Sequence, residues 1–270
     1  MDPILIASLL ALGAGVGVAA GLLGIGGGMI LVPFLTFLLP RFGVSQELAV
    51  HASIATAMAT ILFTSLSSVR AHHKRGAIRW DVVRAMVPGL ILGGMLSGGA
   101  VFAVIDGTAL AIVFGVFVLY SAYKMGRNTP VPQGRALPGQ AAIVAMGALI
   151  GFVSGLLGAG GAFLSVPFML RGNVPVRQAV ATSAALGFFI SLANSVGYIW
   201  SGEAVNGGQP GMIGYIYWPA LLIVSAMSIC TAPVGASLAH KISQLALKRI
   251  FAAMLTMLAI YMIGQAIVHA

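Results

Sequence analysis

A glycine-rich segment of fourteen residues occurs twice in this sequence, 134 residues apart. The first copy is GLLGIGGGMILVPF at residues 21–34 and the second is GLLGAGGAFLSVPF at residues 155–168, with nine identical positions. Each copy places a glycine cluster inside an apolar stretch, where glycine favours a break in the helix. Matching interruptions in the apolar segments of two halves are typical of the binding sites of membrane transporters. The duplicated break is therefore the first candidate for a functional site.

Charged side chains are too scarce for an ordinary soluble domain. They make up 7% of the 270 residues, while hydrophobic side chains make up 59%; about a quarter of a soluble domain is charged. Several apolar runs reach the roughly 20 residues that a helix needs to cross a bilayer. The formal net charge of +9 is concentrated in short clusters between those runs, as in cytoplasmic loops and unlike a nucleic-acid surface. The sequence predicts a multi-pass integral membrane protein, in contact with lipid and not with nucleic acid.

The apolar blocks divide into two halves of similar plan. A second match, AVHAS at 49–53 and AVATS at 179–183, follows the first motif at nearly the same offset. The apolar blocks run at about 4–39, 47–69, 82–104, 107–124, 140–170, 177–200, 213–238 and 248–269. The predicted parts are an N-terminal transmembrane repeat at 1–125, a cytoplasmic linker at 126–139 and a C-terminal transmembrane repeat at 140–270.

The distribution of Lys and Arg predicts how the halves face the membrane, because cytoplasmic loops carry an excess of both. Basic clusters at 70–84, 124–135 and 241–249 mark three cytoplasmic loops. The loops near Asp106 and Glu203 contain neither Lys nor Arg. We expect these two loops on the outer face.

These assignments require the two longest blocks to turn back at their glycines. Block 140–170 must begin and end inside, because Arg171 and Arg177 follow it and the next span leads to an outer loop. The same reasoning places both ends of block 4–39 outside, although Arg41 then lies outside as well. The predicted fold is an all-α integral membrane protein of two inverted repeats, each a broken or re-entrant helical hairpin followed by three transmembrane helices.

A helix that begins within a membrane leaves its first N–H groups without helical acceptors. The positive end of the helix dipole at such a terminus attracts an anion. Two such termini would bind an anion without a buried Lys or Arg. The candidate binding glycines are Gly26, Gly27 and Gly28 in the first copy and Gly160 and Gly161 in the second. Close helix packing is the alternative role of a membrane glycine, and it is our interpretation of the glycines outside these clusters.

Hydroxyl and amide side chains in the following spans are further candidates for anion binding. Such groups donate hydrogen bonds to oxyanion oxygens without the cost of a buried charge. The candidates are Ser53, Thr56, Thr182, Ser183 and Asn194. The alternative for the hydroxyls is a bond to the carbonyl four residues earlier, the commoner fate of Ser and Thr in membrane helices.

His51 is the titratable side chain within the second duplicated motif, where the other copy has Ala181. An imidazole changes its charge near neutral pH, so His51 is a candidate for coupling transport to protons. The alternative is a histidine whose hydrogen bonds are satisfied locally near the outer end of its span. No set of converging metal ligands is evident, and we expect neither a metal nor a cofactor.

Gly24–Phe34 with Ala49–Ser53, and Gly158–Phe168 with Ala179–Ser183, resemble the duplicated motifs of the TauE/SafE sulfite exporter family, also called the toluene sulfonate uptake permease class. The resemblance covers essentially the whole chain. It implies a carrier that moves sulfite, sulfoacetate or another organosulfonate across the inner membrane without an ATP-hydrolysing partner. The second cluster has Ala162 where the first has Gly28, so the two copies need not bind substrate equally.

A secondary transporter that works by alternating access is therefore the leading hypothesis. A passive anion channel stays open as an alternative, because the spans offer few carboxylates that could couple transport to protons. An intramembrane hydrolase is disfavoured, since no histidine or acid in the same half is placed to activate Ser154 or Ser165. The expected partners are a small anion, the bilayer and, as a candidate only, a second copy of the chain in a homodimer.

Overall fold

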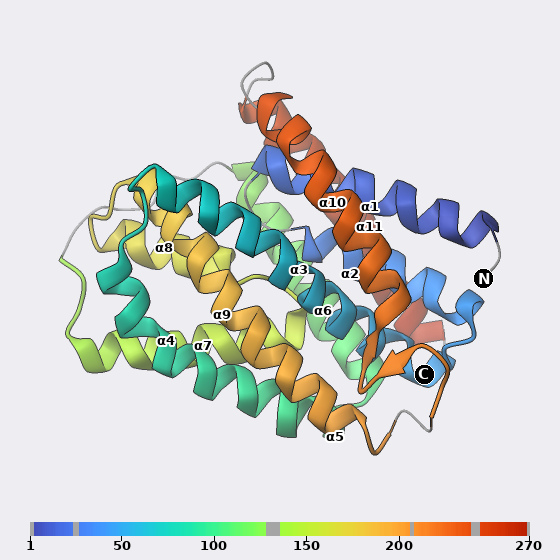
Figure 1. Cartoon of the computed structure of the whole chain (residues 1–270). Helices are drawn as coiled ribbons and strands as arrows, with labels where there is room; N and C mark the ends of the chain where they lie inside the picture. Colours follow the sequence, from blue (N-terminus) through green and yellow to red (C-terminus); the bar gives the residue numbers. More distant parts are fainter. Residues whose placement is uncertain (1–2, 24–26, 128–135, 206–207, 239–243, 269–270) are drawn as a thin grey trace.

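A computed structural model of the chain describes residues 3–23, 27–127, 136–205, 208–238 and 244–268. Figure 1 shows a bundle of helices with one small hairpin of strands. The helices are α1 (Pro3–Leu23), α2 (Gly28–Leu38), α3 (Ala49–Lys74), α4 (Trp80–Met95), α5 (Phe102–Val104), α6 (Gly107–Arg127), α7 (Gln140–Leu157), α8 (Ala162–Arg171), α9 (Val176–Gly202), α10 (Trp218–Leu238) and α11 (Gln244–Val268). Shorter elements are η1 (Leu39–Phe42), η2 (Gln46–Leu48), the π-helix η3 (Leu96–Val101) and strands β1 (Met212–Ile213) and β2 (Ile216–Tyr217).

The prediction of an all-α integral membrane protein is confirmed. Among the described residues, 8 helices are long and apolar enough to cross a bilayer, and the segments 28–42 and 162–171 are shorter apolar helices. Large apolar side chains cover the outside of the bundle, with Leu92, Trp200 and Met257 each at least 68% exposed. An apolar exterior of this kind is stable only against lipid.

Each of the two longest apolar blocks is divided at its glycine cluster, as predicted. In the second half, α7 ends at Leu157 and α8 begins at Ala162. The chain returns to the end from which it came, because a Cβ on Gly172 would lie 2.4 Å from the side chain of Leu137. Figure 1 shows α1 and α2 forming a similar turn in the first half.

Helices α3 and α9 form the centre of the bundle. They pack against each other, and 72% and 67% of their spans are buried, against 28–39% for the other six long helices. The short helix α2 packs on α3, and α8 packs on α9. Both broken hairpins are therefore held against the most buried part of the protein.

The outer contacts are reciprocal between the two halves. The first arm of each hairpin packs mainly on a helix of the opposite half, α1 on α10 and α7 on α4. The last helices of the halves, α6 and α11, pack on each other. Since α1 corresponds to α7 and α4 to α10 in the duplicated plan, the same contact is made twice. The two halves are thus interlocked along the whole bundle.

The interface between α4 and α7 depends on glycine, as the packing interpretation predicts. A Cβ on Gly93 would lie 2.0 Å from the Ala148 carbonyl oxygen, and one on Gly151 would lie 2.4 Å from the Leu90 carbonyl oxygen. These distances are too short for any side chain, so the two backbones are in direct contact. Small residues that allow such an approach are the usual basis of helix association in lipid.

The sequence-based boundaries are wrong at the seventh apolar block. Residues 212–217 form the antiparallel hairpin of β1 and β2, in which Met212 pairs with Tyr217, and α10 begins only at Trp218. The hairpin turn contains Gly214 at φ +56, a conformation that glycine adopts without strain. Apolar residues predicted to belong to a span therefore form a cap at one end of the bundle.

Replacement of Gly151 by Ala will destabilise the protein, because the new methyl group meets the Leu90 backbone and cannot be avoided by a rotamer change. Overpacking of this kind costs about 1–3 kcal/mol. Gly15→Ala is the matched control, since nothing lies within 4 Å of its Cβ position in α1, and alanine is the better helix former by about 1 kcal/mol. Thermal unfolding in detergent will show a lower Tm for Gly151→Ala only. Equal Tm values for both variants would contradict direct backbone contact.

Candidate functional site

The glycine breaks of the two halves lie next to each other in the centre of the bundle. A Cβ on Gly28, at the start of α2, would lie 2.2 Å from the carbonyl oxygen of Gly158. A Cβ on Gly158 would in turn lie 3.0 Å from Val32, on α2. Segments 130 residues apart in the sequence therefore meet where both apolar helices are interrupted.

Both short helices begin at a glycine and have no side-chain cap. The N-cap residues are Gly27 for α2 and Gly161 for α8, and no side chain hydrogen-bonds at either cap. The first bonds of α2 run from Ile30 and Leu31 to the Gly27 carbonyl. The first bonds of α8 run in the same way to Gly161. Gly161 has φ +73, which glycine adopts readily and other residues rarely do.

Within the described part of the chain, the earliest N–H groups of the two helices are available to a ligand. Among the described residues, no acceptor is hydrogen-bonded to the N–H groups of Gly28, Met29, Ala162 and Phe163. Gly28 and Met29 are buried. Free donors at the N-termini of helices, in a buried position, form a site that favours an anion.

Helices α8 and α9 each supply one hydroxyl to a pair beside the second break. Gly160 and Gly187 are close, since a Cβ on Gly187 would lie 3.3 Å from the Gly160 carbonyl oxygen. Ser183 lies one turn before Gly187, and its Oγ is 2.8 Å from the Oγ of Ser165 in the first turns of α8. Both serines are buried. Only one hydroxyl proton is needed to join them, so the pair keeps a second donor for another partner.

The two candidate threonines anchor loops of the opposite half. Thr56 Oγ1 accepts the Tyr217 N–H at 3.0 Å, and Thr182 Oγ1 accepts the Arg79 N–H at 3.0 Å. Tyr217 and Arg79 each stand directly before the tryptophan that begins α10 or α4. The hydroxyls therefore hold corresponding loops in place, which gives each threonine a structural role.

Asn194 and Ser53 are also engaged within the protein. Asn194 Oδ1 accepts the Ser97 hydroxyl at 2.8 Å, and Asn194 Nδ2 donates to the Ile190 carbonyl at 2.9 Å. Ser97 lies in the π-helix η3, so this amide braces the irregular turn of the third span. Ser53 donates to the Ala49 carbonyl at 2.6 Å. Gly26 lies outside the described residues.

The structure thus places Gly28 against Gly158, Gly160 beside α9, and Ser183 of α9 against Ser165 of α8. Ser165 could be found from the sequence, because it is the polar residue that replaces Leu31 of the first copy. The hydrogen bonds that Thr56 and Thr182 accept could not be found from the sequence, since their donors lie more than 100 residues away.

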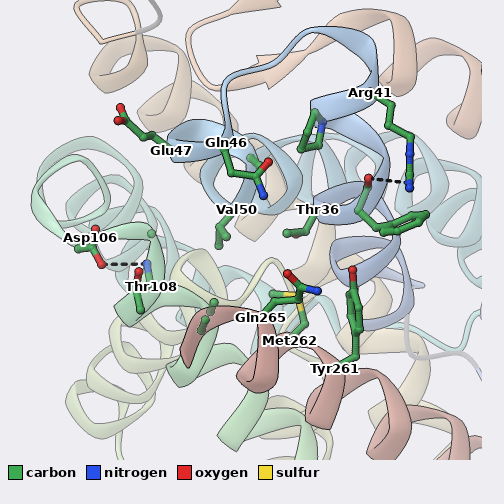
Figure 2. A pocket seen from close by; sticks show the side chains of 16 residues that line it. Thr36, Arg41, Gln46, Glu47, Val50, Asp106, Thr108, Tyr261, Met262 and Gln265 are labelled. Carbon is green, nitrogen blue, oxygen red and sulfur yellow. Dashed lines mark hydrogen bonds between the residues drawn. The ribbon is translucent and has the colours of Figure 1, made fainter. Parts of the chain in front are cut away.

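A cavity of about 520 Å³ lies between α2, α3, α6 and α11, at the end of the bundle that contains Asp106. Figure 2 shows Arg41 and Tyr261 at one side of it, Asp106 at the other and Gln265 between them. Arg41 stacks on Phe37, with the guanidinium carbon 3.6 Å from the ring centroid. Sequence reasoning missed this cavity, although Tyr261 and Gln265 stand four residues apart in an apolar helix and are a signal for it.

Known proteins similar to this chain are membrane transporters. The family model "Sulfite exporter TauE/SafE" matches residues 9–262. A protein of Haemophilus influenzae named a probable membrane transporter protein is 35% identical, over 94% of this chain and 96% of its own length. A second one, of Methanocaldococcus jannaschii, is 28% identical over 96% of both chains. YunE of Bacillus subtilis, with the same description, is 31% identical over 72% of this chain and 78% of its own.

No solved structure matches the chain. The family match extends over nearly the whole sequence and includes both glycine motifs. Together with the long apolar helices, it identifies a multi-pass transporter of the membrane. The chain belongs to the TauE/SafE sulfite exporter family.

Proposed function

We propose that the protein is a secondary transporter of a small sulfur-containing anion, such as sulfite, sulfoacetate or another organosulfonate. The anion binds where the two glycine breaks meet. The observation that supports this site is the close approach of the two breaks, with Gly28 at the uncapped start of α2 against the Gly158 carbonyl, which lies between the end of α7 and the uncapped start of α8. Family membership supports the class of substrate.

The electrostatics of this site suit a single negative charge. Each helix N-terminus is equivalent to roughly half a positive charge, so two of them offset about one charge on the anion. Hydrogen bonds from N–H groups to a charged acceptor contribute about 1.5–3 kcal/mol each. In this proposal the glycines at 26–28 and 160–161 supply the backbone donors, and Ser183 supplies a hydroxyl. The other candidates, Ser53, Thr56, Thr182 and Asn194, support the walls of the site.

Alternating access fits the interlocked plan of the bundle. The same contacts are made twice, by α1 on α10 and by α7 on α4, so each half can move against the other about the crossing of α3 and α9. A binding site at the junction of two repeats is the usual arrangement in such carriers. Exposure of the breaks first to one face and then to the other would move the anion across.

Counterflow in proteoliposomes tests the function. Vesicles preloaded with unlabelled sulfite, sulfate, sulfoacetate or a taurine-like sulfonate are diluted into a trace of the same labelled compound. A carrier will accumulate label transiently and with saturation for at least one sulfur anion. Flux without counterflow would indicate a channel. Absence of flux for every compound would refute a sulfur anion as the substrate.

Replacement of Gly28 by Ala will abolish counterflow, because the methyl group meets the Gly158 carbonyl and separates the two breaks. The variant must still insert and remain monodisperse, which size exclusion in detergent checks. Gly264→Ala is the matched control, since nothing lies within 4 Å of its Cβ position in α11. Normal counterflow in the inserted Gly28→Ala protein would contradict a site between the breaks.

Replacement of Ser183 by Ala will raise the KM for the anion about 2- to 13-fold, as expected from the loss of one hydrogen bond of about 0.5–1.5 kcal/mol. Ser191→Ala is the control on the same helix, because the buried Ser191 hydroxyl donates to the Gly187 and Phe188 carbonyls. The assay is the concentration dependence of counterflow. An unchanged KM for Ser183→Ala would limit this serine to packing with Ser165.

A further inference from the structure

His51 is a buried imidazole that ties the two halves together at one end of α3. Only 6% of the residue is exposed. Its ring stacks on Tyr215 of the β-hairpin, with centroids 5.2 Å apart, and meets the edge of Phe102 at 4.9 Å. It is thus fixed in place by the first half, in α5, and by the second half, next to β2.

The hydrogen bonds of this ring determine where its proton lies. His51 Nε2 is 3.1 Å from the Phe102 carbonyl oxygen and 3.0 Å from the Ile105 carbonyl oxygen. Carbonyl oxygens only accept hydrogen bonds, so Nε2 carries the proton. In the neutral ring Nδ1 is then a bare acceptor. It is buried, and it has no hydrogen-bond partner among the described residues.

A glycine that lines the cavity lies directly against the unpartnered nitrogen. The Cβ position of Gly107 is 3.7 Å from His51 Nδ1 and 3.3 Å from the Glu47 carbonyl oxygen. Gly107 and Glu47 both line the cavity of about 520 Å³ shown in Figure 2. Gly107 therefore separates the buried Nδ1 from the cavity without a side chain between them.

We propose that His51 Nδ1 is the proton-binding site of the transporter, loaded from the cavity past Gly107, and that one proton moves with each anion. This inference rests on the proposed function. It concerns the coupling ion and its route, which are separate from the anion site between the breaks.

Burial of the imidazole favours its neutral form, and the Asp106 carboxylate favours the charged form. The charged and titratable groups on the elements packed about it are the carboxylates of Glu47 and Asp106 and the phenol of Tyr215, with Arg41 across the cavity. Hydrogen bonds from Thr108 lower the pKa of the exposed Asp106 carboxyl, so this group stays ionised near neutral pH. Its charge acts on the His51 ring.

The imidazole is close enough to the glycine breaks for its charge to affect the anion. The Cβ position of Gly158 is 3.4 Å from Ile54 Cα, and His51 precedes Ile54 by one helical turn, roughly 4.5 Å along the axis. The two helix termini together offset about one negative charge of the anion. A proton on Nδ1 adds one further positive charge near it. Proton and anion therefore stabilise each other in the carrier and move in the same direction.

His51→Gln tests the coupling, because glutamine keeps a donor for the two carbonyls but cannot be protonated. Proteoliposomes with the membrane potential clamped at zero receive labelled sulfoacetate across a gradient of about one pH unit. With the parent protein, the concentration of sulfoacetate inside the vesicles will rise to about tenfold that outside, because one coupled proton and one pH unit give a tenfold concentration ratio. His51→Gln will not accumulate it but will still exchange it in counterflow. Equal accumulation by both proteins would overturn the proposal.

Direct titration of the ring tests the site without any substrate. In ¹⁵N-histidine-labelled protein in nanodiscs, the His51 ring will show the Nε2–H form at neutral pH and convert to imidazolium on acidification. Gly107→Ala, whose methyl group fills the space before Nδ1, will block or slow this conversion, and Gly264→Ala will not. A His51 ring that stays neutral until the protein unfolds would refute the proton site. If counterflow fails for every sulfur anion but His51 titrates as described, the proposed function fails and the proton site stands.

Discussion

A polypeptide cannot leave backbone N–H and C=O groups unbonded in hydrocarbon, and this requirement governs the whole bundle. Two apolar helices are interrupted at glycine, so their free backbone groups have to be enclosed by protein. The structure encloses them by placing α3 and α9, its most buried helices, against the short arms α2 and α8. The reciprocal packing of α1 on α10 and α7 on α4 holds this arrangement closed. The anion site that we propose would use the backbone donors that two such breaks leave free.

Glycine serves two distinct purposes in this protein. Gly93 and Gly151 allow the backbones of α4 and α7 to touch, and any side chain there would force them apart. Gly161, with its positive φ, instead begins a helix without a capping side chain. The first purpose gives stability in lipid, where apolar burial contributes little. The second purpose leaves backbone donors free at the centre of the bundle. The stability that glycine packing provides offsets the cost of these free donors.

Much of the fold could be predicted from the sequence, because length and hydropathy determine spans, and the duplicated glycines mark the breaks. The hairpin at 212–217 could not, since its apolar residues look the same as the start of a span. The residues of the candidate site were harder to predict than the fold. Ser183 lies beside a break as expected, but Thr56 and Thr182 bond to loops of the opposite half, and such long-range partners leave no local pattern. Nor does a pattern reveal that Gly107 lies against a nitrogen of His51.

The most direct test of the central claim is to locate a bound anion. A structure determined with selenite, a heavier analogue of sulfite, would reveal its position by anomalous scattering. We predict a selenium peak between the starts of α2 and α8, with oxygens about 3 Å from the N–H groups of Met29 and Phe163. A peak in the Arg41 cavity alone, with the breaks empty, would contradict the account.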